Sequence, residues 1–178
     1  MATDTPLLDA RRAARRRLVE EHVACENRHD LDGVLQTFGS RATYEDRPWD
    51  DKRIGRDGVR EYYDAIMRAV PDLYIDVQRW HIADDTITLE VIIRGTHIGA
   101  WRDLPGTGRK VAIPLCGIYT FDENDRLAGE RIYYDRATVL SQLGVFHEPQ
   151  TLLGKLSIAL MHPVTMARIA ARKVLGKK

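Results

Sequence analysis

The sequence contains only two cysteines, Cys25 and Cys116, and they lie far apart in the chain. A small secreted domain stabilised by disulfides would carry more of them, so two free thiols in a cytoplasmic protein are the simplest interpretation. The N-terminal segment has no continuous apolar stretch of signal-peptide length, which also favours the cytoplasm. No apolar run reaches the roughly 18 residues expected of a membrane-spanning helix.

Several catalytic and metal-binding motifs are missing as well. The 6 histidines form no HxH or HxxxH pair, so we expect no metal site. The glycine-rich stretch from Gly106 to Arg109 neither follows a strand nor precedes a helix, which argues against a phosphate-binding loop. There is no Gly-x-Ser-x-Gly nucleophile motif. The net charge of +1 gives no indication of nucleic-acid binding.

The chain is long enough for one domain with an appended segment. We place the domain at residues 1–148 and the extension at 149–178, because residues 151–178 contain lysines and arginines but no acidic residue. Pro163 divides this extension into two apolar stretches. A basic amphipathic helix can lie on an anionic membrane. The more common alternative is a helix that packs on the domain or on a dimer partner.

Hydrophobic periodicity predicts helices first and then strands. The expected helices are 9–29, 31–38, 58–70 and 137–143, and the expected strands are 42–48, 73–82, 86–98, 110–121 and 127–134. Asp57 and Asp135 are expected to cap the helices that follow them. This order indicates an α+β domain, in which a curved antiparallel sheet wraps around the N-terminal helices as an α+β roll. The helices are too few to fill the concave face, so a cone-shaped cavity is expected.

The stretch ATYEDRP at 42–48, followed by IGRDGVREYYDAI at 54–66, resembles the ketosteroid isomerases of the nuclear transport factor 2-like fold. The resemblance implies that Asp46 stands at the place of the general-base aspartate of that family. His22 stands where the family has a tyrosine. Gly117 stands where the family has a protonated aspartate, and a glycine cannot supply the neutral acid on which that mechanism depends.

The resemblance to the nuclear transport factor 2-like fold covers roughly residues 15–145, and over the later strands the chain is more similar to the SnoaL-like polyketide cyclases. The matching residues are Gly95-Thr96-His97, Gly99, Leu104-Pro105, Thr107-Gly108-Arg109 and Asp135. Ile132 departs from the family, where tryptophan is frequent. The resemblance implies a small-molecule enzyme that needs no cofactor and closes or isomerises a ring by proton transfer. It also implies a homodimer and an acid/base role for Asp135.

Three residues are therefore the candidate catalytic groups: Asp135, His97 and Asp46. His97 follows Ile87, Leu89, Val91 and Ile93 on one face of a strand, and an imidazole there titrates near neutral pH. Asp135 can instead cap the helix that follows it. If Glu130 and Tyr134 face the pocket, strict alternation turns Asp135 away unless the strand is bulged.

The remaining candidates are expected to bind a small apolar ligand. They are His22, Tyr44, Trp101, Tyr119, Glu130 and Tyr134, which offer apolar area with a polar tip. Two other functions stay open. One is a non-catalytic binding or interaction domain that holds a lipid-like ligand. The other is an epoxide hydrolase, which would require Asp46, Arg131 and Asp135 to converge.

Overall fold

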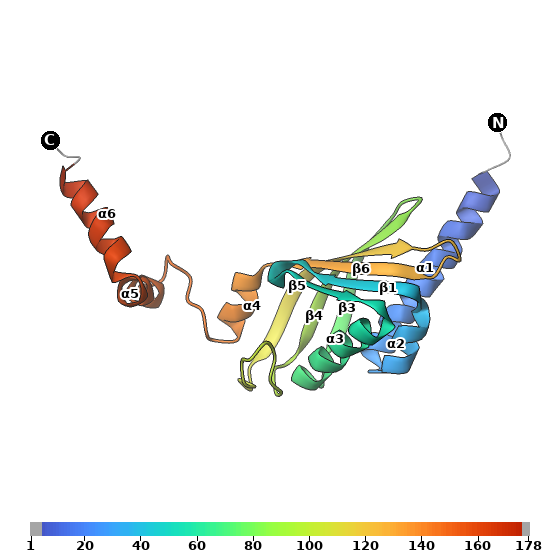
Figure 1. The fold of residues 1–178 in the computed structure, drawn as a ribbon, viewed down its shortest axis with the longest axis horizontal. Helices are drawn as coiled ribbons and strands as arrows, with labels where there is room; N and C mark the ends of the chain where they lie inside the picture. Colours follow the sequence, from blue (N-terminus) through green and yellow to red (C-terminus); the bar gives the residue numbers. More distant parts are fainter. Residues whose placement is uncertain (1–4, 176–178) are drawn as a thin grey trace.

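The computed structural model describes residues 5–175 and confirms the α+β class. Helices and a curved sheet form one domain, and two further helices extend from its C-terminal end (Figure 1). The helices are α1 (Thr5–Asn27), α2 (Leu31–Thr37), α3 (Gly55–Ala69), α4 (Arg136–Gln142), α5 (Leu152–Met161) and α6 (Pro163–Leu175). The strands are β1 (Phe38–Asp46), β2 (Asp51–Ile54), β3 (Tyr74–Ile82), β4 (Thr86–Thr96), β5 (Lys110–Phe121) and β6 (Leu127–Tyr134).

The sheet has the strand order β2-β1-β6-β5-β4-β3. All neighbours are antiparallel except β1 and β6, which run parallel, so the expectation of a wholly antiparallel sheet is wrong at this pair. The reason is the chain path. Helix α3 carries the chain from the β1–β2 hairpin to the opposite edge, and the meander from β3 to β6 returns in the direction of β1.

Side-chain alternation separates the two faces of the sheet, as expected for strands. On β4, Ile87, Leu89 and Val91 are buried. On β6, Glu130 and Ile132 are buried, whereas Arg131 and Tyr133 point outwards. The buried set packs against Val19, Val23 and other apolar residues of α1, α2 and α3 to form the main core. Breaks in register within β1–β6, β3–β4 and β5–β6 add to the curvature.

One local prediction is wrong, and one short strand is absent from the predicted elements. Strand β2 was not expected, because its four residues, DKRI, are too few and too polar to show a period. Asp57 does not cap α3: the helix begins at Gly55, its N-cap is Ile54, and Asp57 lies within the first turn. Asp135 does cap α4, as expected, by accepting hydrogen bonds from the backbone N–H groups of Ala137 and Thr138.

The C-terminal helices α5 and α6 pack on each other and lie away from the sheet and its covering helices (Figure 1). Their apolar side chains are largely exposed. Of the two packing alternatives, packing on the domain is not the arrangement found, and packing on a dimer partner stays a prediction. Among residues 5–175, no helix has the length and apolar character needed to cross a bilayer.

Candidate active site

A cavity lies between the inner face of the sheet and helices α1, α3 and α4. It offers about 90 Å³ to the centres of water-sized molecules. One water needs about 10–15 Å³ by that measure, so several waters or a small ring compound fit. Its lining is mainly apolar and aromatic, and consists of Glu26, Tyr44, Tyr62, Tyr63, Ile66, Met67, Val70, Leu73, Ile75, Ile93, His97, Trp101, Val111, Ile113, Leu115, Ile132, Tyr134, Val139 and Leu143.

His97 lies in the wall of this cavity and is only 2% exposed. The Thr107 N–H donates to His97 Nδ1 at 3.3 Å, and the Thr107 hydroxyl lies 3.2 Å from the same nitrogen. These contacts assign the ring proton to Nε2, which is buried and has no hydrogen-bond partner among the described residues. Burial lowers the pKa of His97. The side chain therefore offers a neutral N–H donor to a ligand.

The loop that carries His97 is fixed by backbone hydrogen bonds. The His97 N–H donates to Arg109 O, and the Gly108 N–H donates to His97 O. The next two N–H groups, of Ile98 and Gly99, both donate to Ala69 O at the end of α3. A Cβ on Gly99 would lie 2.3 Å from Arg68 O, so this approach requires glycine. The segment 95–99 thus holds the imidazole of His97 beside α3.

His22 is fully buried behind the cavity wall, and both of its ring nitrogens have partners. Thr37 Oγ1 donates to Val34 O, so it accepts from His22 Nδ1 at 2.7 Å. Tyr63 donates to Glu130 Oε2 at 2.6 Å, so its oxygen accepts from His22 Nε2 at 3.0 Å. Two donating nitrogens describe an imidazolium. Burial lowers the pKa of His22, but the carboxylates of Glu26 and Glu130 outweigh this effect and raise it overall.

Glu26 lies one helical turn after His22 on α1 and reaches the cavity wall. It is 5% exposed, and its Oε2 has no hydrogen-bond partner among the described residues. Burial raises the pKa of Glu26 to about 7, attraction to His22 opposes this shift, and repulsion from Glu130 adds to it. A carboxyl group that titrates near neutrality beside an apolar cavity is suited to general acid–base catalysis.

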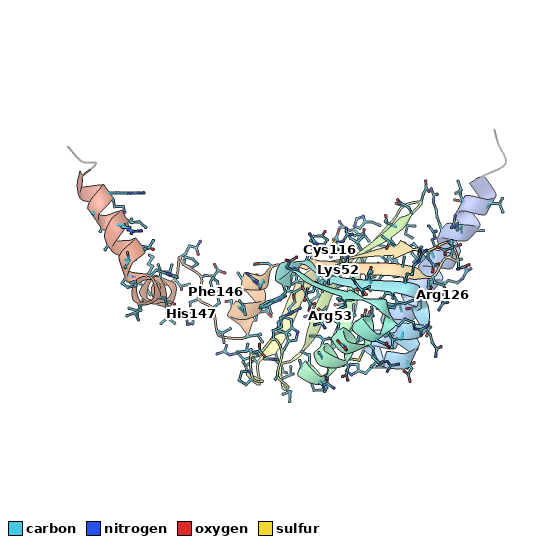
Figure 2. All side chains as sticks on the ribbon, in the orientation of Figure 1. Lys52, Arg53, Cys116, Arg126, Phe146 and His147 are labelled. Carbon is cyan, nitrogen blue, oxygen red and sulfur yellow. The ribbon has the colours of Figure 1, made fainter. Side chains whose placement is uncertain are left out.

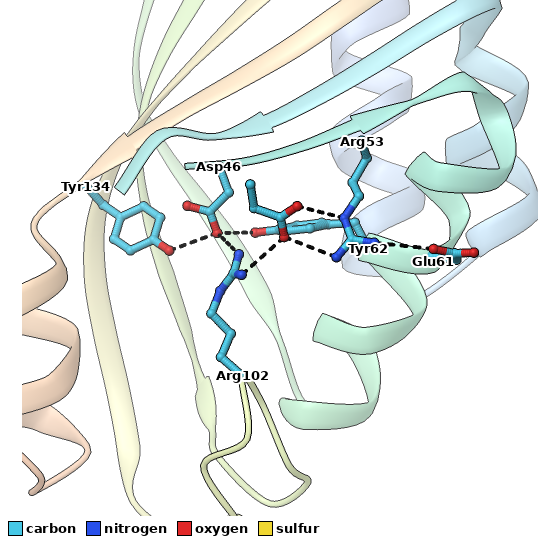
Figure 3. A network of polar contacts seen from close by, with 7 residues as sticks. Asp46, Arg53, Glu61, Tyr62, Arg102 and Tyr134 are labelled. Atoms are coloured by element: carbon cyan, nitrogen blue, oxygen red, sulfur yellow. Dashed lines mark hydrogen bonds and ion pairs between the residues drawn. The ribbon is translucent and has the colours of Figure 1, made fainter. Parts of the chain in front are cut away.

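Asp46, at the end of β1, is fully buried and belongs to a different polar network (Figure 3). Its Oδ2 accepts hydrogen bonds from Tyr62 at 2.9 Å, Tyr134 at 3.1 Å and Arg102 at 2.6 Å. Arg102 also pairs with Asp51 at 3.1 Å. Asp46 itself does not line the cavity, but Tyr62 and Tyr134 do. The carboxylate therefore fixes two aromatic rings of the cavity wall by accepting from their hydroxyl groups.

Arg102 reaches Asp46 because of a tight turn and two indole rings. Arg102 and Asp103 have φ values of 49° and 63°, in the left-handed region. The guanidinium lies 4.9 Å from the ring of Trp49 and 5.2 Å from that of Trp101. Cation–π contacts of this kind stabilise a positive charge at a partly buried position. Trp101 thus has two roles, since it also lines the cavity.

Asp135 lies outside the cavity, so the expectation that it lines the pocket is wrong. Its side chain is exposed and accepts hydrogen bonds from the N–H groups of Ala137 and Thr138 and from the Thr138 hydroxyl. These bonds lower its pKa, which keeps the carboxylate ionised. The physical reason is alternation: Glu130, Ile132 and Tyr134 point inwards, and no bulge turns Asp135 back.

The structure divides the other expected ligand-binding residues into two groups. Tyr44, Trp101 and Tyr134 line the cavity. His22, Tyr119 and Glu130 do not belong to its described lining. They lie behind it, where the rings of Tyr119 and His22 pack edge to face at 5.7 Å. These three residues support the wall and set the charge around Glu26.

The set expected for an epoxide hydrolase does not form as predicted. Arg131 points outwards and pairs with Glu45, which separates it from Asp46. Arg102 takes its place: it joins Asp46 to Asp51 in an aspartate–arginine–aspartate arrangement (Figure 3).

Comparison with known proteins supports this architecture. The model of the SnoaL-like polyketide cyclase family matches residues 16–143. The chain belongs to this family. No curated protein sequence matches the chain. Among solved structures, TsrD from Streptomyces laurentii has a TM-score of 0.67 at 19% identity, and the match covers 75% of this chain and 97% of that one.

Two further solved structures have the same fold. SalBIII, an epoxide hydrolase/cyclase-like enzyme with a role in pyran ring formation in the polyether salinomycin, has a TM-score of 0.61 at 21% identity, covering 70% of this chain and 92% of that one. A protein of ketosteroid isomerase-like fold from Catenulispora acidiphila, in complex with trimethylamine, has a TM-score of 0.62 at 18% identity, covering 72% and 92%. At these identities the likeness establishes the SnoaL-like fold alone.

Sequence reasoning missed Glu26, Arg102, Tyr62 and Tyr63 as site residues. Glu26 carried a usable signal, since it lies four residues after His22 and therefore on the same face of a helix. The tyrosines are adjacent on α3, and one donates to Asp46 while the other donates to Glu130. No sequence pattern indicates that Arg102 contacts Asp46, because the direction of the Arg102 side chain depends on the left-handed turn at Arg102 and Asp103.

Proposed function

We propose that this SnoaL-like protein is an enzyme that acts on a small apolar carbonyl compound, polyketide-like or steroid-like in character. It moves a proton at the carbon next to the carbonyl group and thereby closes or isomerises a ring. Side chains of the chain itself supply the acid and the base, so this chemistry needs no cofactor.

One observation carries the proposal: two residues in the wall of an apolar cavity each have a buried polar atom without a hydrogen-bond partner among the described residues. These are Oε2 of Glu26 and Nε2 of His97. Buried polar atoms are normally paired, and each unpaired one costs about 1–3 kcal/mol. The carbonyl oxygen of a ligand would accept from His97 Nε2–H, and the acidic C–H group beside that carbonyl would lie against the Glu26 carboxylate.

The first step is proton abstraction. The ionised Glu26 takes a proton from the carbon beside the carbonyl group, and the electron pair moves onto the carbonyl oxygen to form an enolate. His97 Nε2–H donates a hydrogen bond to that oxygen and stabilises its negative charge. Burial raises the pKa of Glu26 to about 7, which lies closer to the pKa of the carbon acid than the pKa of an ordinary carboxyl group does. Proton transfer from carbon to Glu26 is therefore less unfavourable.

The second step returns the proton. In a cyclisation, the enolate carbon attacks a second carbonyl group of the same molecule, and the resulting alkoxide takes the proton from Glu26. In an isomerisation, Glu26 delivers the proton to a different carbon of the enolate system. Either route regenerates the carboxylate and leaves no net charge on the product.

The Asp46 network would position the ligand in this scheme. Burial and then the charge of Asp46 raise the pKa of Tyr62, so its hydroxyl remains protonated and bound to that carboxylate. Tyr62 also stacks on Tyr44, with ring centroids 4.2 Å apart. A rigid aromatic wall restricts a flat ligand to a few orientations, and such positioning contributes to rate.

Exchange of carbon-bound hydrogen in D₂O tests the proposal directly. A panel of cyclic ketones and diketones is incubated with the protein, and loss of the α-proton signal is followed by NMR. We expect exchange with the wild type, and a loss of at least a hundredfold with Glu26→Gln. Asp135→Asn is the matched control, since it also replaces a carboxylate but outside the cavity.

Two results would contradict the proposal. Equal exchange by wild type and Glu26→Gln would remove Glu26 as the base. Saturable binding of a panel compound with no exchange would support the alternative of a non-catalytic binding domain.

Epoxide hydrolysis is the second candidate, because Arg102 joins Asp46 and Asp51 next to the cavity tyrosines. Asp46 Oδ1 has no partner among the described residues and could hold a water molecule. That water would attack an epoxide carbon and lose its proton to Asp46, while a Tyr62 or Tyr134 hydroxyl protonates the leaving oxygen. Turnover of cyclic epoxides that Asp46→Asn abolishes and Glu26→Gln retains would favour this route.

A further inference from the structure

The C-terminal extension presents one continuous apolar face to solvent. In α5, Leu152, Leu153, Leu156 and Leu160 are 85%, 61%, 56% and 71% exposed. At 100° per residue they fall within about one third of the helix circumference. On the opposite side Gly154 is buried against the turn at Glu148. We call these four residues the leucine face.

Helix α6 adds further exposed apolar residues and positive charge. Val164 and Ile169 are 63% and 44% exposed. Arg168, Arg172 and Lys173 lie on one side of α6 by helical spacing. With Lys155 of α5 they form a basic set, and residues 149–175 contain no aspartate or glutamate. Apolar and cationic surfaces are therefore combined in a segment without acidic groups to balance them.

Nothing in the domain covers the leucine face. The two helices project from the segment that contains Phe146 and His147 (Figure 2). Isolated exposed leucines are ordinary, but four on one face beside two further apolar residues form a patch that normally has a partner. The family match also ends at residue 143, so the extension has no counterpart in the fold that builds the cavity.

The charge of the extension identifies the kind of partner. A symmetric contact between two copies of these helices would bring like charges together, which opposes association. An anionic bilayer surface attracts each basic side chain and accepts the leucines among its acyl chains. No described helix can span a bilayer, so the helices would lie along its surface.

We propose that α5 and α6 form a membrane-surface element that binds anionic lipid bilayers through the leucine face and the basic residues of α6. This inference goes beyond the proposed function and does not depend on it. It has one structural consequence: only residues 143–151 separate the element from α4, and Val139 of α4 and the following Leu143 line the cavity.

The test is co-sedimentation of the full chain with two kinds of vesicle. One kind is phosphatidylcholine alone, and the other is phosphatidylcholine mixed with phosphatidylglycerol. We expect binding to the anionic vesicles, at least tenfold weaker binding to the neutral ones, and loss of binding as salt concentration rises. Equal binding to both vesicles, or to neither, would overturn the proposal.

Matched variants separate the contribution of the basic residues from that of the leucine face. Replacing Arg168, Arg172 and Lys173 by Gln is expected to weaken binding about a hundredfold, since each charge contributes about fivefold. Replacing Arg41, Arg56 and Arg79 by Gln removes the same charge from exposed positions of the domain and is expected to leave binding unchanged. Equal weakening by the two sets would mean that net charge, and not this element, is responsible.

A second pair of variants tests the leucine face. Leu153→Ser with Leu160→Ser is expected to weaken vesicle binding at least tenfold. Ile54→Ser with Val145→Ser changes two exposed apolar residues of the domain, 72% and 51% exposed, and serves as the control. Sedimentation equilibrium on the same proteins measures whether the leucine face binds a second copy of the chain instead of a bilayer. Dissociation of a dimer by the leucine variant, without any wild-type vesicle binding, would overturn the proposal.

Discussion

Oε2 of Glu26 lies 3.7 Å from Nε2 of His22, one helical turn away on α1, and both groups are buried. His22 donates through both nitrogens, to Thr37 and Tyr63, and is therefore cationic. Glu130 provides the nearer carboxylate, 3.3 Å from the same nitrogen. Glu26 is left as the carboxyl group whose proton can be exchanged, and it is the one that reaches the cavity.

This relationship predicts that Glu26→Gln changes stability in a pH-dependent way. Between pH 4.5 and about 7 the folded chain keeps a proton on Glu26 that the unfolded chain releases. The free energy of unfolding of the wild type therefore falls as pH rises through this interval, by about 3 kcal/mol. Gln mimics the protonated acid, so the variant should match the wild type near pH 5 and exceed it near pH 8.

Urea denaturation at the two pH values measures this difference. His22, whose pKa is raised by Glu26 and Glu130 against the effect of burial, also stabilises the folded wild type at low pH and loses that effect as pH rises. Glu26→Gln removes the charge of Glu26, so this His22 contribution should also be smaller in the variant. Glu20→Gln is the control, because Glu20 is exposed and, among residues 5–175, pairs with Arg16 alone. A Glu26→Gln variant that is less stable than the wild type near pH 8 would contradict the assignment.

Much of this site follows from elements that the sequence predicts well, and its missing parts have definable causes. The two-residue period of 86–96 and 110–121 is strong because one face of each strand is buried, so β4 and β5 were expected nearly as found. On β6 the isomerase resemblance suggests that Glu130 and Tyr134 face inwards, and alternation then turns Asp135 outwards, which is where the structure places it. Arg102 could not be predicted, because its contact with Asp46 spans 56 residues and depends on a left-handed turn.

His97→Phe is predicted to lower turnover without unfolding the protein. Phenylalanine keeps the volume and apolar packing but removes the Nε2–H donor, and loss of one such donor typically reduces kcat by about 10²–10³. The Thr107 N–H also loses its acceptor, which should cost about 1 kcal/mol of stability. Deuterium exchange and thermal unfolding measure the two effects. His81→Phe, at an exposed position on β3, should leave exchange intact, and unchanged exchange by His97→Phe would exclude a role in the reaction.

Arg102→Met is predicted to destabilise the fold by about 3–5 kcal/mol, because it leaves the fully buried Asp46 without its positive partner. Arg53→Met removes a charge that also pairs with Asp51 but is 37% exposed, and should cost less than about 1 kcal/mol. Urea denaturation compares the two variants. Adding Asp46→Asn to Arg102→Met should recover part of the loss, since the uncompensated charge is then gone. If the double variant were no more stable than Arg102→Met alone, the ion pair would not be the source of the effect.

Asp135 provides the last prediction, and it separates a structural role from a catalytic one. Asp135→Ala should cost about 1 kcal/mol, because the side chain caps α4 through the N–H groups of Ala137 and Thr138. Asp135→Asn should cost less, since asparagine also caps helices well. Because Asp135 is exposed and outside the cavity, both variants should retain wild-type proton exchange once folded. Loss of exchange in Asp135→Asn, at a pH where its thermal stability matches the wild type, would return Asp135 to the mechanism and count against Glu26 as the only base.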